Sequence, residues 1–92
     1  SGGITRPAPA NFRSRVTAVT KDVNGENLVA IAAGSADGLQ ENMRLIVVRD
    51  GRFLANLVVE NVNINDAVGR ANTLGRDNVV IQPGDMIRSA NG

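Results

Sequence analysis

Residues 34–51 constrain the fold more than any other part of the chain. They read G-S-A-D-G-L-Q-E-N-M-R-L-I-V-V-R-D-G, so a polar turn between glycines leads into an apolar run that stops at Asp50-Gly51. A second apolar run, residues 53–62, follows at once. Because Asp-Gly favours tight turns between strands, this pattern predicts a β-hairpin that is preceded by a loop.

The rest of the chain repeats the signals of short strands. Residues 14–22 alternate with the period of a strand, and Asn24-Gly25 predicts a type I′ hairpin turn into a strand over residues 27–33. Further strands are expected at 43–49, 52–62, 67–74 and 85–88, with one helical turn within the 34–42 loop, at 36–40. Turn signals recur about every 8–12 residues, as in small barrels and sandwiches. We therefore predict an all-β, five- to six-stranded, partly open barrel built from two hairpins plus short C-terminal strands.

The chain divides into an arm and a single domain. Residues 1–12 contain Pro7 and Pro9 and few side chains to bury, which predicts a flexible N-terminal arm or linker. A chain of 92 residues accommodates one domain, expected over residues 13–90. An arm of this kind is typical of a module tethered to a larger protein.

Composition argues against several classes of function. The sequence has neither Cys nor His, which removes disulfides, thiolate chemistry and the usual general base and zinc ligand. Ten Lys and Arg against nine Asp and Glu give a net charge of +1, so the whole molecule has no strong field for nucleic acid or anionic lipid. No apolar run approaches the ~18 residues that a membrane-spanning helix needs, so we predict no membrane span.

The central hairpin is apolar on both sides. Alternation places Leu45 and Val47 opposite Ile46 and Val48 in its first strand. In its second strand, one side carries Phe53, Ala55, Leu57 and Val59 and the other Leu54, Val58 and Val62. One set, with Phe53 in it, can fill the barrel, and the other needs a cover. The 34–42 loop or the N-terminal arm is one candidate cover. The other is a partner, bound to an interaction surface of Leu54, Val58, Ile46 and Val48 with Arg44, Arg49 and Arg52 as a polar rim.

Catalytic and metal sites are poorly supported by the residues present. The carboxylates Asp37, Glu41, Asp50, Glu60, Asp66, Asp77 and Asp85 are spread over different loops and strand ends. A domain this small rarely holds the ~300 Å³ cleft that acid–base chemistry by a carboxylate pair needs. The oxygen-rich segment 22–27 lacks the spacing of a helix-loop-helix calcium site, and a hairpin turn explains it fully. We expect no enzymatic activity, no metal, no cofactor and no small-molecule ligand.

Nucleic acid is the alternative partner. Small barrels bind single strands through exposed aromatic side chains and a basic groove, and Arg44, Arg49 and Arg52 gather near the Asp50-Gly51 turn. Against this reading, Phe53 is expected in the core, Phe12 lies at the edge of the linker, and the chain is nearly neutral. A carbohydrate-binding role is disfavoured by the shortage of aromatic residues. Charged residues that protect a hairpin tip explain the arginines more simply.

The order of turn residues resembles a known family. The pattern G-x-x-D-G-L-x-x-x-M, then R-D-G, A-V-G-R-A and I-Q-P-G-D-M-I is similar to small β-barrel modules of bacterial envelope proteins, such as the C-terminal domain of flagellar assembly protein T. The matching residues are Gly34, Asp37, Gly38, Leu39, Met43, Asp50, Gly51, Val68, Gly69, Pro83, Gly84 and Asp85. The family has Gly before the Met where this chain has Asn42, and Asn also tolerates positive φ.

The resemblance implies a non-catalytic structural or protein–protein interaction module of a larger bacterial envelope protein, in the periplasm or cell envelope. Its partners would be other domains of the same chain or further copies of it. The residues that carry the resemblance form turns, so they specify a fold better than an activity.

Overall fold

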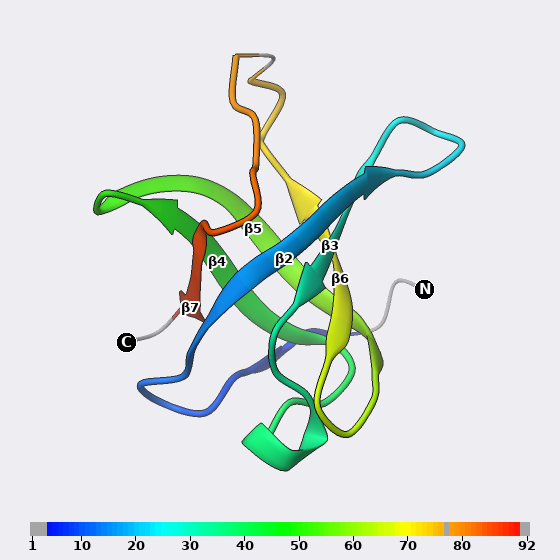
Figure 1. Ribbon diagram of the computed structural model, residues 1–92, viewed down its shortest axis with the longest axis vertical. Helices are drawn as coiled ribbons and strands as arrows, with labels where there is room; N and C mark the ends of the chain where they lie inside the picture. The colour runs from blue at the N-terminus through cyan, green and yellow to red at the C-terminus, as the bar shows by residue number, and fades with distance from the viewer. Residues whose placement is uncertain (1–3, 77, 91–92) are drawn as a thin grey trace.

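The structure is a small barrel of antiparallel strands (Figure 1). It is a computed structural model that describes residues 4–76 and 78–90. The strands are β1 (Arg6–Pro7), β2 (Arg13–Lys21), β3 (Asn27–Ile31), β4 (Met43–Arg49), β5 (Arg52–Val62), β6 (Ala67–Asn72) and β7 (Met86–Ser89). In this part of the chain the only helical element is a 3-10 turn, η1 (Ser35–Asp37). The predicted all-β barrel is confirmed.

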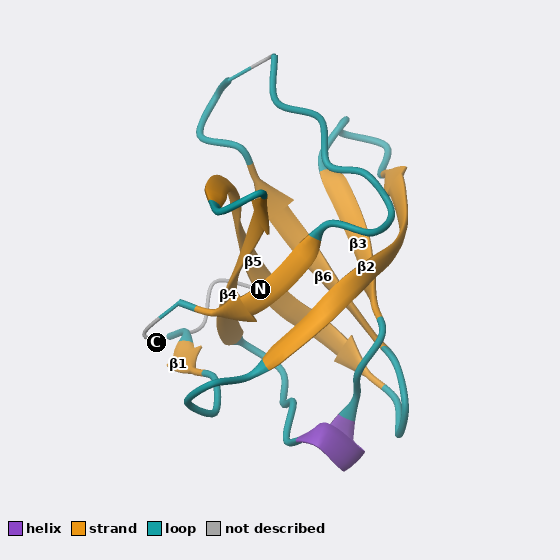
Figure 2. Ribbon diagram, turned by 60° about the vertical axis from the view of Figure 1, so that its left-hand side comes forward, coloured by secondary structure: helices purple, strands orange, loops and turns teal. Residues whose placement is uncertain are grey.

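Six strands form a closed ring. Their order is β4–β5–β6–β3–β2–β7, and β7 pairs back onto β4, for example through Ile46 and Arg88. Closure removes the exposed edges that the expected, partly open barrel would leave. The short β1 lies outside the ring and pairs in parallel with β4 at Met43 and Arg44, beside the end of β7 (Figure 2).

The Asp50-Gly51 turn has the geometry expected of an Asp-Gly hairpin. Both residues have positive φ, 52° and 79°, as a type I′ turn requires, and Arg49 pairs with Arg52 across it. The two strands that it joins, β4 and β5, have the bounds that the sequence predicts.

The predicted type I′ turn at Asn24-Gly25 is wrong, because only Gly25 of this pair has positive φ. The Asp22 side chain explains the difference. Its Oδ1 accepts hydrogen bonds from the backbone N–H groups of Asn24 at 2.8 Å and Glu26 at 3.0 Å. These bonds stabilise a wider turn, which the backbone closes between Asp22 N–H and the Glu26 carbonyl at 2.9 Å.

Three β-bulges interrupt the alternation of the long strands. The extra residues are Thr17 in β2, and Leu54 and Glu60 in β5. Each bulge exchanges the inner and outer positions beyond it. At Leu54 the exchange turns Phe53 outward, where it pairs with Val48 and is 38% exposed. The prediction that Phe53 belongs to the core is therefore wrong.

The core fills the inside of the barrel. Its most deeply buried members are the inward-facing residues Val29, Ile31, Leu45, Val47, Ala55, Leu57, Val59 and Ile87, each at most 1% exposed. Leu39 of the 34–42 loop packs into the same cluster. The second predicted strand ends earlier, at Ile31, and the fifth ends at Asn72.

The N-terminal arm packs onto the barrel over part of its length. The Arg6 N–H donates to the Asn42 carbonyl at 2.8 Å, and Ala8 and Phe12 are buried in the core cluster. Phe12, placed by the sequence at the edge of a linker, is thus a core residue. The arm and the 34–42 loop lie at one end of the barrel, so the cover expected from them does not lie over the outer side of β4 and β5 (Figure 2).

Two loop positions decide how that end is built. A Cβ at Gly34 would lie 2.2 Å from the carbonyl oxygen of Asn63 and 2.6 Å from that of Ile64, so only glycine fits. Asn42 has a φ of 70°, which agrees with the expectation that asparagine replaces glycine there. The helical turn expected at 36–40 lies slightly earlier, at Ser35–Asp37.

Candidate interaction surface

Three of the seven residues predicted for the interaction surface lie together on the outside of the barrel. Arg44 and Ile46 point outward from β4, and Val58 of β5 pairs directly with Arg44. Ile46 and Val58 are half-buried, and Arg44 is exposed. Asn56, the partner of Ile46 on β5, completes this strip and is exposed.

The other apolar members contribute less to that surface. Val48 lies on the outer side, between its pairing partners Phe53 and Met86, and is only 5% exposed. Leu54 is the bulge residue, and it packs partly against the core. Arg52 lies next to the hairpin turn and is exposed. The apolar part of the surface is therefore smaller than alternation alone predicts.

Arg49 belongs to the frame of the barrel rather than to a binding rim. Its Nε donates to Asp85 Oδ1 at 2.7 Å and its Nη2 to Oδ2 at 2.8 Å, and Nη2 also donates to the Val80 carbonyl at 2.7 Å. Asp85 is 5% exposed, and its Oδ2 also accepts from the Gln82 N–H. The Arg49 guanidinium, with help from this N–H, holds the pKa of Asp85 below its usual value.

Tertiary pairing brings three further arginines to the same side of the barrel, and the sequence reading missed them. Arg13 of β2 is directly opposite Arg88 of β7, and Arg88 is directly opposite Ile46 of β4. Two residue pairs along, on the same side of the sheet, Arg15 is opposite Met86. We call Arg13, Arg15, Arg88, Met86, Arg44 and Ile46 the basic face. Only the strand order and register reveal it, because its residues come from both ends of the chain.

The charges of the basic face are not neutralised within the described chain. Among residues 4–76 and 78–90, Arg13, Arg15, Arg44 and Arg88 take part in no ion pair. Arg13 Nη1 makes one weak contact, to Met86 Sδ at 3.6 Å. Like charges directly opposite each other on antiparallel strands are destabilising. The Arg13–Arg88 pair is therefore an unfavourable arrangement that a bound anion would relieve.

Phe53 forms a small aromatic site at the margin of this face. The Arg76 guanidinium lies over its ring at 5.5 Å from the centroid, within cation–π range. Arg76 Nη2 also donates to the Leu54 carbonyl at 2.6 Å. One side of the ring is thus already occupied by a side chain of the same molecule.

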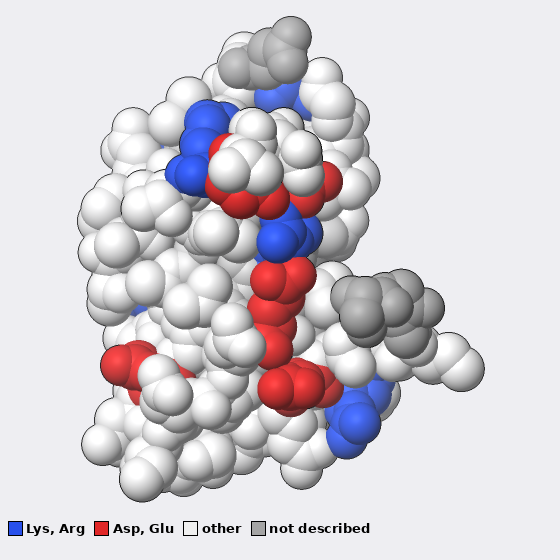
Figure 3. All heavy atoms as spheres, turned by 90° about the vertical axis from the view of Figure 1, so that its right-hand side faces the viewer, with Lys and Arg blue, Asp and Glu red and all other residues white. Residues whose placement is uncertain are grey.

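The side of the barrel with the β2–β3 hairpin is acidic. Arg70 of β6 is held by three carboxylates, at 2.5 Å from Asp22, 2.6 Å from Glu26 and 2.8 Å from Glu60. These bonds, first those from Glu60 and Asp22, raise the pKa of Arg70, and Arg70 in turn lowers the pKa of Asp22. We call Asp22, Glu26, Glu60 and Arg70 the acidic cluster. Figure 3 shows acidic side chains forming a band down this face.

A shallow apolar groove adjoins the acidic cluster. It has a volume of about 200 Å³ and is lined by the outward side chains Ala18, Thr20, Leu28, Ala30 and Val68 of β2, β3 and β6. Leu28 pairs directly with Arg70, so the groove and the cluster are continuous. The small side chains of Ala18 and Ala30 create the hollow, because their larger neighbours flank it.

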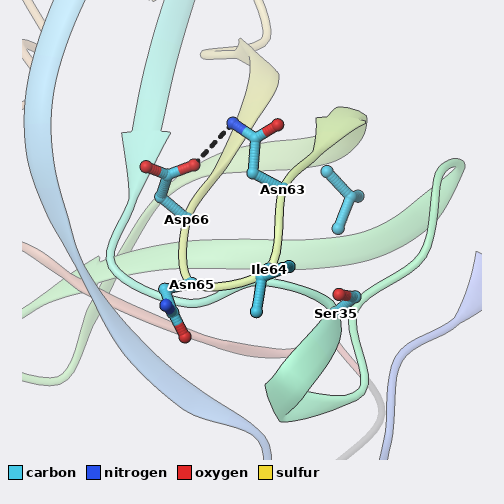
Figure 4. A pocket seen from close by; sticks show the side chains of 6 residues that line it. Ser35, Asn63, Ile64, Asn65 and Asp66 are labelled. Atoms are coloured by element: carbon cyan, nitrogen blue, oxygen red, sulfur yellow. Dashed lines mark hydrogen bonds between the residues drawn. The ribbon is translucent and has the colours of Figure 1, made fainter.

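The larger hollow beside the β5–β6 hairpin is lined by polar groups that bond to one another. It measures about 510 Å³ and is lined by Ser35, Val62 and residues 63–66 (Figure 4). The Ser35 and Ala36 N–H groups, which could otherwise bind an anion, already donate to the carbonyls of Asn63 and Ile64. The Asp66 carboxylate accepts from Asn63 Nδ2 at 2.7 Å. These polar groups hold two loops together.

Three of the carboxylates considered for catalysis form separate structural contacts. Asp85 is paired with Arg49, Glu60 with Arg70, and Asp37 accepts from the Gly34 N–H at 3.0 Å. Asp77 lies outside the described residues. Within the described chain, no three acidic residues are close enough together to hold a metal ion. Asp22, the first residue of the oxygen-rich loop, uses its oxygens for turn amides and Arg70.

The described residues contain no helix that is long and apolar enough to cross a membrane. Comparisons with family models, with curated proteins and with solved structures gave no match for this chain.

Proposed function

We propose that this barrel is a non-catalytic protein-interaction module whose basic face binds an acidic protein surface. The Arg13–Arg88 juxtaposition carries the proposal. The two like charges are on directly opposite residues, and neither arginine forms an ion pair with a carboxylate of the described residues. The half-buried Met86 and Ile46 lie between the arginines and offer apolar contact area. Arginine around an apolar centre is typical of protein interfaces.

The resemblance to envelope barrels supports the wider setting of this role. It implies a structural or interaction module of a larger bacterial envelope protein. Three of the seven predicted residues, Arg44, Ile46 and Val58, belong to the proposed surface, and Arg13, Arg15, Arg88 and Met86 extend it across β7 to β2.

Binding of a labelled acidic peptide, a 20-residue copolymer of Glu and Leu, tests the proposal by fluorescence anisotropy at about 50 mM salt. We expect saturable binding that weakens with salt, and at least about tenfold weaker binding by the Arg13→Gln/Arg88→Gln variant. The matched control is Lys21→Gln, since Lys21 lies at the opposite end of β2 from Arg13, where it donates to the Gly25 carbonyl. No binding at low salt, or equal binding by both variants, would contradict the proposal.

A single-stranded nucleic acid is the second candidate, favoured by one observation. Phe53 lies outside the barrel and is 38% exposed, so an aromatic side chain borders the basic face. A labelled oligonucleotide in the same experiment separates the two candidates, because phosphate contacts are strongest at low salt. Tighter binding of the oligonucleotide than of the acidic peptide would favour the nucleic acid.

A further inference from the structure

We infer that the acidic partner of the basic face is a second copy of this chain, bound head to tail through its acidic cluster and the adjoining groove. This inference rests on the proposed function. It concerns two surfaces of one molecule that are complementary in charge and that form no ion pair with each other within the described chain.

The strand order centres the two surfaces on opposite strands of the ring, and β2 reaches both, with Arg13 and Arg15 near its start and Asp22 just after its end. The basic face is centred on β7 and the acidic cluster on Arg70 of β6. In the closed ring β4–β5–β6–β3–β2–β7, these strands are three positions apart in either direction. No ion pair joins the two surfaces within the described chain, so we expect their charges to meet only between two molecules.

The charges of the two surfaces are complementary. Arg13, Arg15 and Arg88 have no carboxylate partner in the described chain, whereas three carboxylates share the single guanidinium of Arg70. Lys21 of the same hairpin donates to the Gly25 carbonyl at 3.5 Å, and the cluster retains an excess of carboxylate with Lys21 included. Glu26 is the most accessible of the three acids, at 56% exposed. It is the natural acceptor for an arginine from a neighbouring copy.

The shapes of the two surfaces are complementary as well. The basic face projects the long side chains of Met86 and the arginines. The acidic side has the groove over Ala18 and Ala30, which is open to solvent and apolar. A methionine side chain adapts to such a hollow because it is unbranched and flexible. Apolar contact of this kind adds to the long-range attraction between the charges.

This arrangement favours an open chain of copies over a symmetric pair. A symmetric dimer through the basic face would place Arg13 and Arg88 against the same arginines of the partner, which is repulsive. A head-to-tail contact leaves one basic face and one acidic cluster free at the ends, so it propagates. An interface of about 600 Å² per copy, roughly a tenth of the 5502 Å² surface, is at the lower limit for specific association, so the contact should be weak and salt-sensitive.

Sedimentation velocity with two blocked variants tests the inference. Arg13→Gln/Arg88→Gln removes the paired charges of the basic face without creating an acidic one, and Ala18→Arg/Glu26→Lys fills the groove and reverses one acid. We expect the wild-type protein to associate increasingly with concentration at about 50 mM salt and to be monomeric at about 500 mM. Each blocked variant alone should be monomeric, and an equimolar mixture should form a heterodimer and nothing larger.

Arg6→Glu and Glu41→Lys are the controls, since neither residue belongs to the basic face or to the acidic cluster, and each should associate as the wild type does. A mixture of the blocked variants that remains monomeric overturns the inference, as does association of either blocked variant alone. Circular dichroism of every variant confirms folding. If the acidic peptide binds but copies do not associate, only this inference fails. If neither binds, the proposed function fails too.

Discussion

The guanidinium of Arg49 holds the carboxylate of Asp85 by two hydrogen bonds, at 2.7 and 2.8 Å, across 36 residues of sequence. The pair joins the end of β4 to the Pro83-Gly84-Asp85 turn that precedes β7. The Asp85 carbonyl also accepts from the Val16 N–H of β2 at 2.9 Å. Asp85 thus links β4 to β2 at the end of β7, where the ring closes.

Asp85→Asn should destabilise the barrel by about 2 kcal/mol. The buried Asp85 carboxylate accepts hydrogen bonds from the Arg49 guanidinium and the Gln82 N–H, and the substitution removes the charge that strengthens them. Urea denaturation followed by circular dichroism measures the change. The outward Glu41, which has no ion pair among the described residues, provides the control Glu41→Gln, with a change within about 0.5 kcal/mol. Equal stability of Asp85→Asn and Glu41→Gln would contradict the structural role of Asp85.

The stability that Asp85 supplies should depend on pH. Its folded pKa is lowered, mainly by Arg49, so the folded state releases this proton more readily than the unfolded state. Its stabilising effect is therefore present above the unfolded value of about 3.9 and is lost as the pH falls through the folded pKa. The difference in unfolding free energy between wild type and Asp85→Asn should narrow below about pH 4. Val59→Ala, a purely apolar core change, should show the same deficit at pH 7 and pH 3.

Ser89→Ala should stabilise the protein by about 1 kcal/mol. Ser89 is fully buried in β7, and its Oγ has no hydrogen-bond partner among the described residues. An unsatisfied buried hydroxyl is unfavourable, and alanine removes it with little change in volume. Thermal unfolding measures the shift, with the exposed Ser35→Ala as the neutral control. A marked loss of stability in Ser89→Ala would show that the hydroxyl has a partner.

Gly34→Ala should be strongly destabilising, by about 3 kcal/mol or more, because its Cβ would collide with two backbone carbonyls that cannot move independently. Gly51→Ala is the matched control. Its Cβ would meet nothing within 4 Å, so it carries only the strain of a φ of 79°, about 1 kcal/mol. Chemical denaturation of both variants measures the difference. A smaller effect at Gly34 than at Gly51 would contradict the close packing of η1 on the β5–β6 hairpin.

The local patterns of the chain predicted the strands well. β4 and β5 have the predicted bounds, since a run of β-branched residues ended by Asp50-Gly51 leaves little alternative. The turn at Asn24 was predicted less well, because Asp22 competes for the turn amides with its own side chain.

Because of the bulges, alternation along a strand does not correctly predict which of its residues face the core. Alternation predicts Phe53 in the core, but Phe53 lies outside, because the extra residue Leu54 shifts the alternation by one position. The reverse error concerns Phe12, which a proline-rich neighbourhood placed in a linker and the structure buries in the core. A single sequence carries no clear signal for a bulge, since its residues are ordinary strand formers.

By itself, the sequence determined the class of fold, the positions of the main hairpin turns and the lack of histidine and cysteine chemistry, because these depend on local propensity and composition. Only the tertiary structure decided the candidate site. Arg13 and Arg88 are 75 residues apart along the chain, and they become neighbours because closure of the ring pairs β2 with β7. The same closure separates the basic face from the acidic cluster. Charge segregation of this kind is a property of strand order, and a nearly neutral composition conceals it.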